Sequence, residues 1–214
     1  RKNNKMRIVC LGSSSVEGIG DKRGLGWVGR LNEHLHTVTP ANYHRVFNLG
    51  LMGDTIAQTH WRYNSEALPR NPQLVLIFTG TSDCQTEGLG DKPTRALSSP
   101  DKYMFEWRKF IKQLKQAGHK TIIIGPTKVN EEKSPMAVLK YYKVWFFNDV
   151  IKQYNENLKK FCNQQDMPFL ELFDLFSEEE LSKYTSDAVH PNEAGYDKIF
   201  EAIKSYLEDN NYVK

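Results

Sequence analysis

Apolar residues gather in short runs that few polar residues interrupt. Four of these runs are RIVCL at 7–11, LVLIF at 74–78, TIIIG at 121–125 and the weaker PFLEL at 168–172, and a shorter one, RVFNL, lies at 45–49. Continuous apolar runs of this length are typical of strands that are buried on both faces of a parallel sheet. The pattern predicts five such strands.

Between these runs, apolar residues recur every three or four positions, which is the spacing of helices that pack on a core. The expected helices cover 55–68, 99–118, 145–164 and a C-terminal segment around 191–207. Asp54 is the expected N-cap of the first helix, which stops before Pro69. Ser99, followed by Pro100, is the expected N-cap of the second, and Gly118 ends it.

Strand and helix alternate through the whole chain, a pattern that indicates βαβ units. We expect one α/β domain over 1–214, a three-layer α/β/α sandwich with a mostly parallel five-stranded sheet. Two segments, 84–98 and 128–144, are longer than plain connections need, and both follow strands. They should therefore lie over the carboxyl edge of the sheet, where open α/β folds bind their ligands.

Composition excludes several classes of protein. The net charge is only +3, from 29 Lys and Arg against 26 Asp and Glu, and the two signs are interspersed, so nothing favours nucleic-acid binding. No apolar run approaches the roughly 20 residues that cross a bilayer. The three cysteines are too few and too far apart for a disulfide framework or zinc cluster, and we expect buried thiols. The chain starts at Arg1 without an initiator Met, so a cytoplasmic location and export after removal of a leader are both open.

The loop after the first strand, GSSSVEGIG at 12–20, is rich in small residues and hydroxyls. One hypothesis makes a serine here a nucleophile, with backbone N–H groups nearby to hold an oxyanion. The other makes the loop an anion nest for a phosphate, as in flavodoxin-like proteins. The loop by itself does not decide between them.

The segment SDAVHPNEAGY at 186–196 favours the nucleophile. A serine needs a base to take its proton, and a carboxylate that orients the base improves it. Asp187 and His190 can supply both from one turn, and Pro191, which we expect at the first position of the last helix, favours an extended His190. We assign no role to the remaining histidines, which are His34, His36, His44, His60 and His119.

Four segments, LGSSSVEGIG, NLGLMGDT, FTGTSD and DAVHPNEAGY, resemble the motif blocks of the GDSL or SGNH hydrolases in order and spacing. The resemblance spans 11–196 and implies the flavodoxin-like SGNH fold and a serine esterase or acylhydrolase that needs no metal or organic cofactor. It implies Ser14 as the nucleophile, His190 as the general base and acid, and Asp187 as the residue that orients His190. It also implies the backbone N–H groups of Ser14 and Gly50 as oxyanion donors.

The chain departs from this family pattern at two positions. Ser13 stands where the family usually has Asp, which should alter hydrogen bonding in the loop rather than catalysis. Ser82 replaces the family's oxyanion Asn, and a hydroxyl on a shorter side chain reaches less far. Ser82 could donate through a shifted loop or a water, Asn48 or another residue could substitute for it, or the enzyme could be slow. We expect Asp83 to anchor the loop.

The expected partner is a small-molecule ester, and its identity and the oligomeric state are left open. Apolar and aromatic residues are dense at 127–147, which could form a lid or acyl-chain wall, or could be core for the helix that follows. Segment 88–100 is another possible rim, where Lys92 and Arg95 could meet an anion or simply be solvated. The alternatives to an esterase are a carbohydrate O-deacetylase, a thioesterase, a non-catalytic ligand-binding protein and, more remotely, a phosphate binder.

Overall fold

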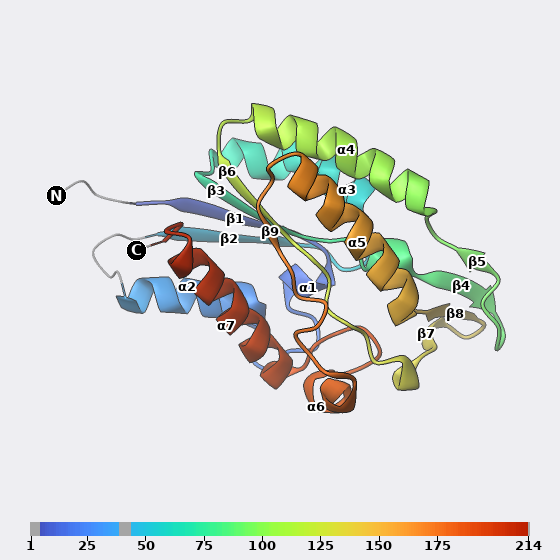
Figure 1. The fold of residues 1–214 in the computed structure, drawn as a ribbon. Helices are drawn as coiled ribbons and strands as arrows, with labels where there is room; N and C mark the ends of the chain where they lie inside the picture. Colours follow the sequence, from blue (N-terminus) through green and yellow to red (C-terminus); the bar gives the residue numbers. More distant parts are fainter. Residues whose placement is uncertain (1–4, 39–43, 214) are drawn as a thin grey trace.

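The computed structural model describes residues 5–38 and 44–213, and its main element is a parallel sheet (Figure 1). The order of its five strands is β2-β1-β3-β6-β9, and every neighbouring pair is parallel. The strands are β1 (Arg7–Gly12), β2 (Arg45–Gly50), β3 (Leu74–Phe78), β6 (Lys120–Ile124) and β9 (Phe169–Leu170). All five predicted strands are present, and β9 is shorter than expected because it pairs only along two residues of β6.

Helices cover both faces of this sheet, which confirms the predicted three-layer α/β/α sandwich (Figure 1). On one face lie α3 (Ile56–Arg62), α4 (Pro100–Gln116) and α5 (Asn148–Gln164), and on the other α2 (Gly26–Val38) and α7 (Glu193–Asp209). Each face of the sheet has its own hydrophobic core, and alternate residues of β1 pack into each. Val9 packs with the first group of helices and Ile8 with the second. A period of two is what a strand buried on both faces requires.

Two helix caps match the prediction and two do not. Ser99 caps α4 by accepting the Lys102 N–H at 3.2 Å, and Gly118 follows its end with φ of +74°. The N-cap of α3, however, is Thr55 rather than Asp54, because Thr55 and Gln58 form a reciprocal capping box. At the start of α7 the cap is Asn192, so Pro191 precedes the helix instead of opening it.

Two predicted helices also have different bounds. The helix predicted over 55–68 leaves the α-conformation after Arg62 and continues as a π-turn (Tyr63–Ala67) and a 3₁₀ turn (Leu68–Arg70). The helix predicted to begin at 145 begins at Asn148, because Trp145 ends a strand.

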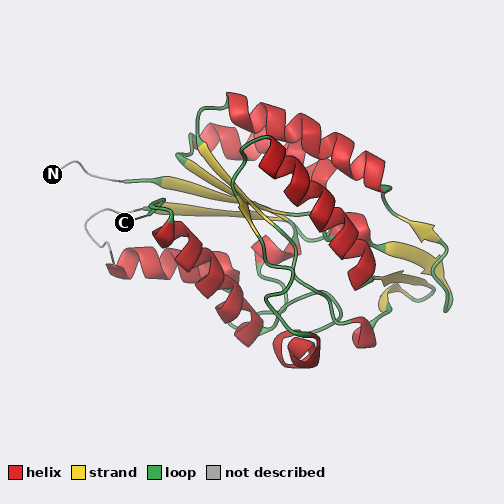
Figure 2. Cartoon of the chain, viewed as in Figure 1, coloured by secondary structure: helices red, strands yellow, loops and turns green. Residues whose placement is uncertain are grey.

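The two long segments expected to be connections form a second, antiparallel sheet in the order β5-β4-β8-β7. Its strands are β4 (Thr86–Leu89), β5 (Arg95–Ala96), β7 (Met136–Leu139) and β8 (Tyr142–Trp145). Figure 2 shows this small sheet beyond one end of the main strands. β4 follows the loop after β3, and β7 follows the loop after β6, so the small sheet lies at the carboxyl edge, as predicted for these segments.

The register of the main sheet brings three loops to one level. Gly12 at the end of β1 lies opposite Gly50 of β2 on one side and Phe78 of β3 on the other. The segments that follow these strands hold the first three motif blocks, and they leave the sheet together. No helix in the described residues is long and apolar enough to cross a membrane, and the three cysteines are free and buried, as predicted.

Candidate active site

Ser14 is the first residue of a four-residue helix, α1 (Ser14–Glu17), which starts directly after β1. Ser13 occupies the N-cap position, and its N–H donates to the Phe78 carbonyl at 3.3 Å. Ser14 is only 6% exposed. The first N–H groups of a helix have no intrahelical acceptor, so the N–H of Ser14 is available to a ligand.

A tight turn holds Asp187 and His190 together. One oxygen of Asp187, Oδ1, accepts the backbone N–H groups of Val189 (2.8 Å) and His190 (2.7 Å), and the other, Oδ2, is 2.7 Å from His190 Nδ1. The turn is closed by the N–H of Ser186, which donates to the His190 carbonyl at 2.9 Å. Neighbouring residues in sequence therefore form the carboxylate and imidazole pair.

The charge on Asp187 fixes the tautomer of His190. Burial acts to raise the pKa of Asp187, but the hydrogen bonds from His190 and Val189 outweigh it and lower that pKa to about 2. An ionised carboxylate only accepts hydrogen bonds, so Nδ1 of His190 carries a proton. In the neutral imidazole the unprotonated nitrogen is then Nε2, which can act as a base.

The loop after α1 packs directly on the His190 turn. A Cβ on Gly20, whose φ is +93°, would lie 2.4 Å from the Pro191 carbonyl oxygen and 3.1 Å from His190 Cβ. The hydroxyl of Tyr196 donates to the Ile19 carbonyl at 2.8 Å. These contacts place Ser14 and His190 on the same edge of the sheet. Among the hydrogen bonds of the described residues there is none between the Ser14 hydroxyl and His190.

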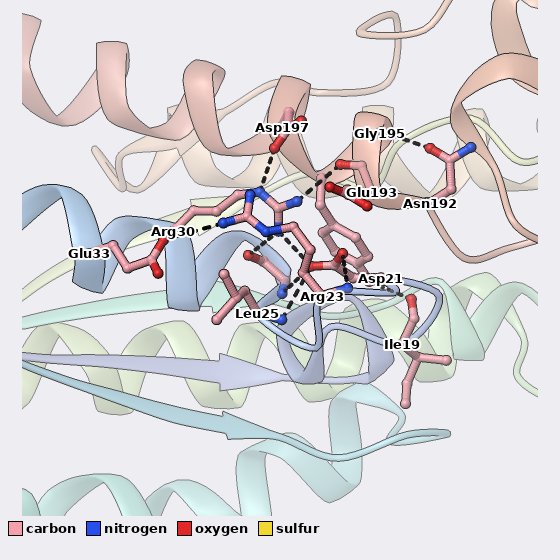
Figure 3. Close-up of polar contacts among 12 residues, drawn as sticks. Ile19, Asp21, Arg23, Leu25, Arg30, Glu33, Asn192, Glu193, Gly195 and Asp197 are labelled. Carbon is pink, nitrogen blue, oxygen red and sulfur yellow. Dashed lines mark hydrogen bonds and ion pairs between the residues drawn. The ribbon is translucent and has the colours of Figure 1, made fainter.

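A buried arginine ties the same loop to α7 (Figure 3). Arg30 donates to Asp21 Oδ2 at 2.6 Å, to Asp197 Oδ1 at 2.6 Å and to the Glu193 carbonyl at 3.2 Å. Burial acts to raise the pKa of Asp21, but Arg30 and backbone N–H groups, including that of Gly26, bring it below the usual value. The network joins the loop after the serine helix to the first turns of the helix that follows His190.

The Gly50 N–H, an expected oxyanion donor, has an intramolecular acceptor. It donates to Asn48 Oδ1 at 2.9 Å. A Cβ on Gly50 would lie 2.0 Å from the backbone nitrogen of Glu17, so glycine is required where β2 passes α1. Three residues later, Gly53 has a φ of +85°, open space beside its Cα and no hydrogen-bonded acceptor for its N–H among the described residues. The sequence interpretation did not single out Gly53.

Ser82 opens a short 3₁₀ turn (Ser82–Cys84) at the same edge, and it is half-buried. Its hydroxyl has no hydrogen-bond partner within the described ranges. Asp83 is buried, and its Oδ2 accepts the N–H of Ile56 at 2.8 Å, which anchors the turn to the start of α3. Burial raises the pKa of Asp83 to about 7, against the opposing effect of that hydrogen bond.

The segment at 127–147 divides into core and surface. Val144 and Phe146 belong to the core under α5, as the core interpretation predicts. Leu139 and Tyr141, at the tip of the β7–β8 hairpin, are 69% and 65% exposed. On the other rim Arg95 pairs with Glu87 at 2.8 Å, and no ion pair involves Lys92 among the residues the structure describes.

Sequence reasoning missed Arg30 and Arg62, the two arginines that are buried in the described part of the chain. The only signal was spacing: Arg62 follows the buried Ile56 and Thr59 on one stripe of α3. Arginines at such positions are usually solvated, so the signal is weak. Across residues 5–38 and 44–213 no group of three or more His, Cys, Asp or Glu is arranged to hold a metal ion.

The chain is similar in sequence to one protein family and in fold to several solved structures. Residues 10–198 match the family described as GDSL-like lipase/acylhydrolase. The fold is similar to a lipase/acylhydrolase from Enterococcus faecalis, with a TM-score of 0.75, 18% identity and 96% of each chain covered. It is also similar to Axe2, an acetylxylan esterase from Geobacillus stearothermophilus, with a TM-score of 0.70, 19% identity, and 97% of this chain and 95% of that one covered. A search of curated proteins finds no match.

Proposed function

Because the chain belongs to the GDSL-like lipase/acylhydrolase family, we propose that it cleaves carboxylic esters through an acyl-enzyme intermediate on Ser14. Membership supports ester hydrolysis as the general activity. The serine mechanism rests on one observation above all, the hydrogen bond of 2.7 Å between Asp187 Oδ2 and His190 Nδ1. That bond leaves Nε2 as the basic nitrogen, which is what a serine nucleophile requires.

In the acylation step, Ser14 Oγ bonds to the ester carbonyl carbon while its proton passes to His190 Nε2. Asp187 stabilises the imidazolium that results and keeps its own negative charge. The tetrahedral intermediate then collapses: the bond to the alcohol oxygen breaks, and His190 returns the proton to that oxygen. The contact between Ser14 and His190 forms with substrate in place, as catalytic hydrogen bonds often do.

In the deacylation step, water attacks the acyl carbon and gives a proton to His190 Nε2. The bond to Ser14 Oγ breaks, the carboxylic acid leaves, and the proton returns to Ser14. Each turnover therefore consumes one ester and one water and yields one acid and one alcohol.

Three groups are proposed to hold the oxyanion. The N–H of Ser14 lies at the start of α1, and the Ser82 hydroxyl lies across the same edge of the sheet. The N–H of Gly50 can donate once Asn48 Oδ1 releases it, and the Gly53 N–H is the alternative donor in that loop. Donors to the oxyanion typically provide the largest single contribution to acyl transfer.

The small sheet favours an ester with an apolar portion. Register places Leu89 of β4 opposite Tyr142 of β8, and Tyr142 opposite Leu139 of β7. Directly opposed residues share a face of a sheet, so the three side chains form one row. Leu89 and Leu139 are 73% and 69% exposed. We infer that this row contacts the acyl chain or another apolar part of the substrate.

A carbohydrate ester is the second candidate substrate. It is favoured by the structural likeness to an acetyl xylan esterase, with a TM-score of 0.73, 18% identity, and 94% of this chain and 100% of that one covered. The same proposed triad would remove an acetyl group from a sugar hydroxyl. Hydrolysis of acetylated xylo-oligosaccharides, compared with that of p-nitrophenyl esters of increasing chain length, distinguishes the two substrate classes.

The test of the mechanism is turnover of p-nitrophenyl acetate by the parent, Ser14→Ala and His190→Ala. We expect the parent to hydrolyse the ester and both variants to lose activity by about 10³-fold or more. Ser15→Ala is the matched control, because Ser15 is the adjacent buried serine and should retain activity. Full activity in Ser14→Ala would refute the assignment, and an inactive parent would favour a non-catalytic ligand-binding protein.

A further inference from the structure

Arg62, the last residue of α3, is buried, and its guanidinium binds four acceptors. Nε donates to Asp54 Oδ2 at 2.6 Å, and Nη1 donates to Glu66 Oε2 at 2.8 Å. Nη2 donates to the carbonyl oxygens of Gly12 and Leu49, both at 3.0 Å. Its side chain is 7% exposed, so solvent replaces none of these contacts easily.

Three of these acceptors, on Gly12, Leu49 and Asp54, lie at the ends of the segments that form the proposed site. Gly12 ends β1 and is two residues from Ser14, while Leu49 immediately precedes Gly50. Asp54 closes the loop that begins at Leu49. Arg62 therefore holds the exit of the nucleophile strand together with both ends of the loop 49–54.

The contact with Leu49 also acts on the neighbouring N–H. The Leu49 carbonyl and the Gly50 N–H belong to the same peptide unit, which is planar and conjugated. A cation bonded to the carbonyl oxygen polarises that unit and makes its N–H a stronger donor. The polarisation acts directly on the Gly50 N–H. The ion pair between Arg62 and Asp54 fixes the position of the adjacent Gly53.

We propose that Arg62 is a positioning residue for ester hydrolysis, which fixes and polarises the oxyanion loop 49–54 relative to Ser14. This inference rests on the proposed function. It assigns the role to a guanidinium because only a planar fork of donors can reach two carbonyls and a carboxylate at once.

The electrostatic surroundings are consistent with this role. Asp54 is buried, and burial raises its pKa against the opposing effect of Arg62. Glu66, whose side chain is 37% exposed, is the outer partner of Arg62 and touches neither strand end. It therefore offers a control that disturbs Arg62 without releasing the loop.

The experiment compares Arg62→Lys with Glu66→Gln. Arg62→Lys keeps the charge beside Asp54 but cannot bridge Gly12 and Leu49. We expect kcat to fall by about 10- to 100-fold with KM changed by less than about threefold, since loss of a whole oxyanion donor costs roughly 10² to 10³. Glu66→Gln should keep kcat within about twofold, because the contacts of Nη2 persist.

Two further arms keep the result decisive. If Arg62→Lys does not fold, Arg62→Met combined with Asp54→Asn avoids an unpaired buried carboxylate, and the same loss of kcat is expected. The Gly50 amide resonance, measured by NMR, should shift and its proton should exchange faster in the Arg62 variants than in Glu66→Gln, whether or not the protein is active.

The outcomes separate the inference from the proposed function. A parent that hydrolyses no ester overturns the proposed function. The Gly50 amide resonance then still shows whether Arg62 fixes the loop 49–54. An active parent with kcat in a folded Arg62 variant equal to that of Glu66→Gln overturns the role of Arg62 alone. An unchanged Gly50 amide in the Arg62 variants also overturns it.

Discussion

Ser82 is the residue at which the proposed site departs from the family pattern. The family pattern implied an asparagine at this position, and the structure shows a half-buried serine whose hydroxyl has no partner in the described part of the chain. Asn48, which the sequence interpretation offered as a substitute donor, presents its acceptor oxygen to the Gly50 N–H instead. Its amide nitrogen lies 3.5 Å from the Glu17 carbonyl, a long contact. Of the proposed oxyanion donors, the Gly50 N–H therefore already has an acceptor, whereas the Ser82 hydroxyl has none among the described residues.

Replacing Ser82 with Asn should strengthen the site. The longer side chain carries an N–H₂ donor farther from the backbone than the serine hydroxyl, so we expect kcat for p-nitrophenyl acetate to rise by about 10-fold or more. Thr81→Asn, one residue earlier in the same turn, is the control and should show no gain. A fall in kcat for Ser82→Asn would mean that the loop is built around serine.

The sequence predicted the contact between Asp187 and His190 because the two residues are only three positions apart, within one turn. It could not predict that Arg62 joins two strands, because those contacts depend on how β1, β2 and α3 meet in space. Asp54 illustrates the limit: its position fits an N-cap, but the adjacent Thr55 has the better capping partner in Gln58.

At the scale of elements, the main sheet was predictable and the small sheet was not. β1, β3 and β6 are buried along nearly their whole length, and a continuous apolar run is a strong signal. The strands of the small sheet have only two to four residues. Few of their side chains, such as Val144, belong to the core. Short strands of mixed polarity cannot be told from loops by pattern alone.

The row of Leu89, Tyr142 and Leu139 on the small sheet should set preference for the acyl chain. We expect the double variant Leu89→Ser and Leu139→Ser to lower kcat/KM for a decanoate ester by about 3- to 10-fold and to leave an acetate ester unchanged, because each methylene removed from water contributes about 0.8 kcal/mol. Phe105→Ser, at an exposed apolar position on α4, is the control. An unchanged chain-length profile in the double variant would remove the row from the substrate site.

The base of the β7–β8 hairpin has a second role, so the row is better tested by substitution than by deleting the segment. The Asn130 N–H donates to the Ala188 carbonyl at 2.8 Å, and Lys133 Nζ donates to the Thr185 carbonyl at 2.9 Å. The base of the hairpin therefore supports the turn that holds His190. A deletion would remove this support together with the apolar tip.

At the scale of the whole molecule, the site depends on the packing of distant segments. β1, β2 and β3 bring three loops to one edge, and the turn before α7 brings the fourth. The three layers followed from the alternation of apolar runs and helical segments, whereas the strand order β2-β1-β3-β6-β9 was not predicted. The single domain over 1–214 stays a prediction.

Stability should depend on pH through Asp83. Burial raises its pKa from 3.8 to about 7, so the folded protein binds this proton more tightly than the unfolded chain does. The contribution is fully present below the unfolded pKa and is lost as pH rises through about 7. Each pKa unit corresponds to about 1.4 kcal/mol.

Urea unfolding of the parent and Asp83→Asn between pH 5 and 8 measures this contribution. We expect the free energy of unfolding of the parent to fall relative to the variant by on the order of 2 kcal/mol across this range. Asp187 does not interfere, because its lowered pKa of about 2 confines its own contribution to more acidic conditions. A difference that is independent of pH would contradict the raised pKa.

The most direct test of the central claim is to locate a covalent adduct. The parent is treated with a fluorophosphonate probe, and the labelled protein is digested and sequenced by mass spectrometry, with Ser14→Ala treated in parallel. We predict one adduct per chain, on Ser14, and none in Ser14→Ala. An adduct on another residue, labelling that persists in Ser14→Ala, or no labelling of the parent would contradict Ser14 as the nucleophile.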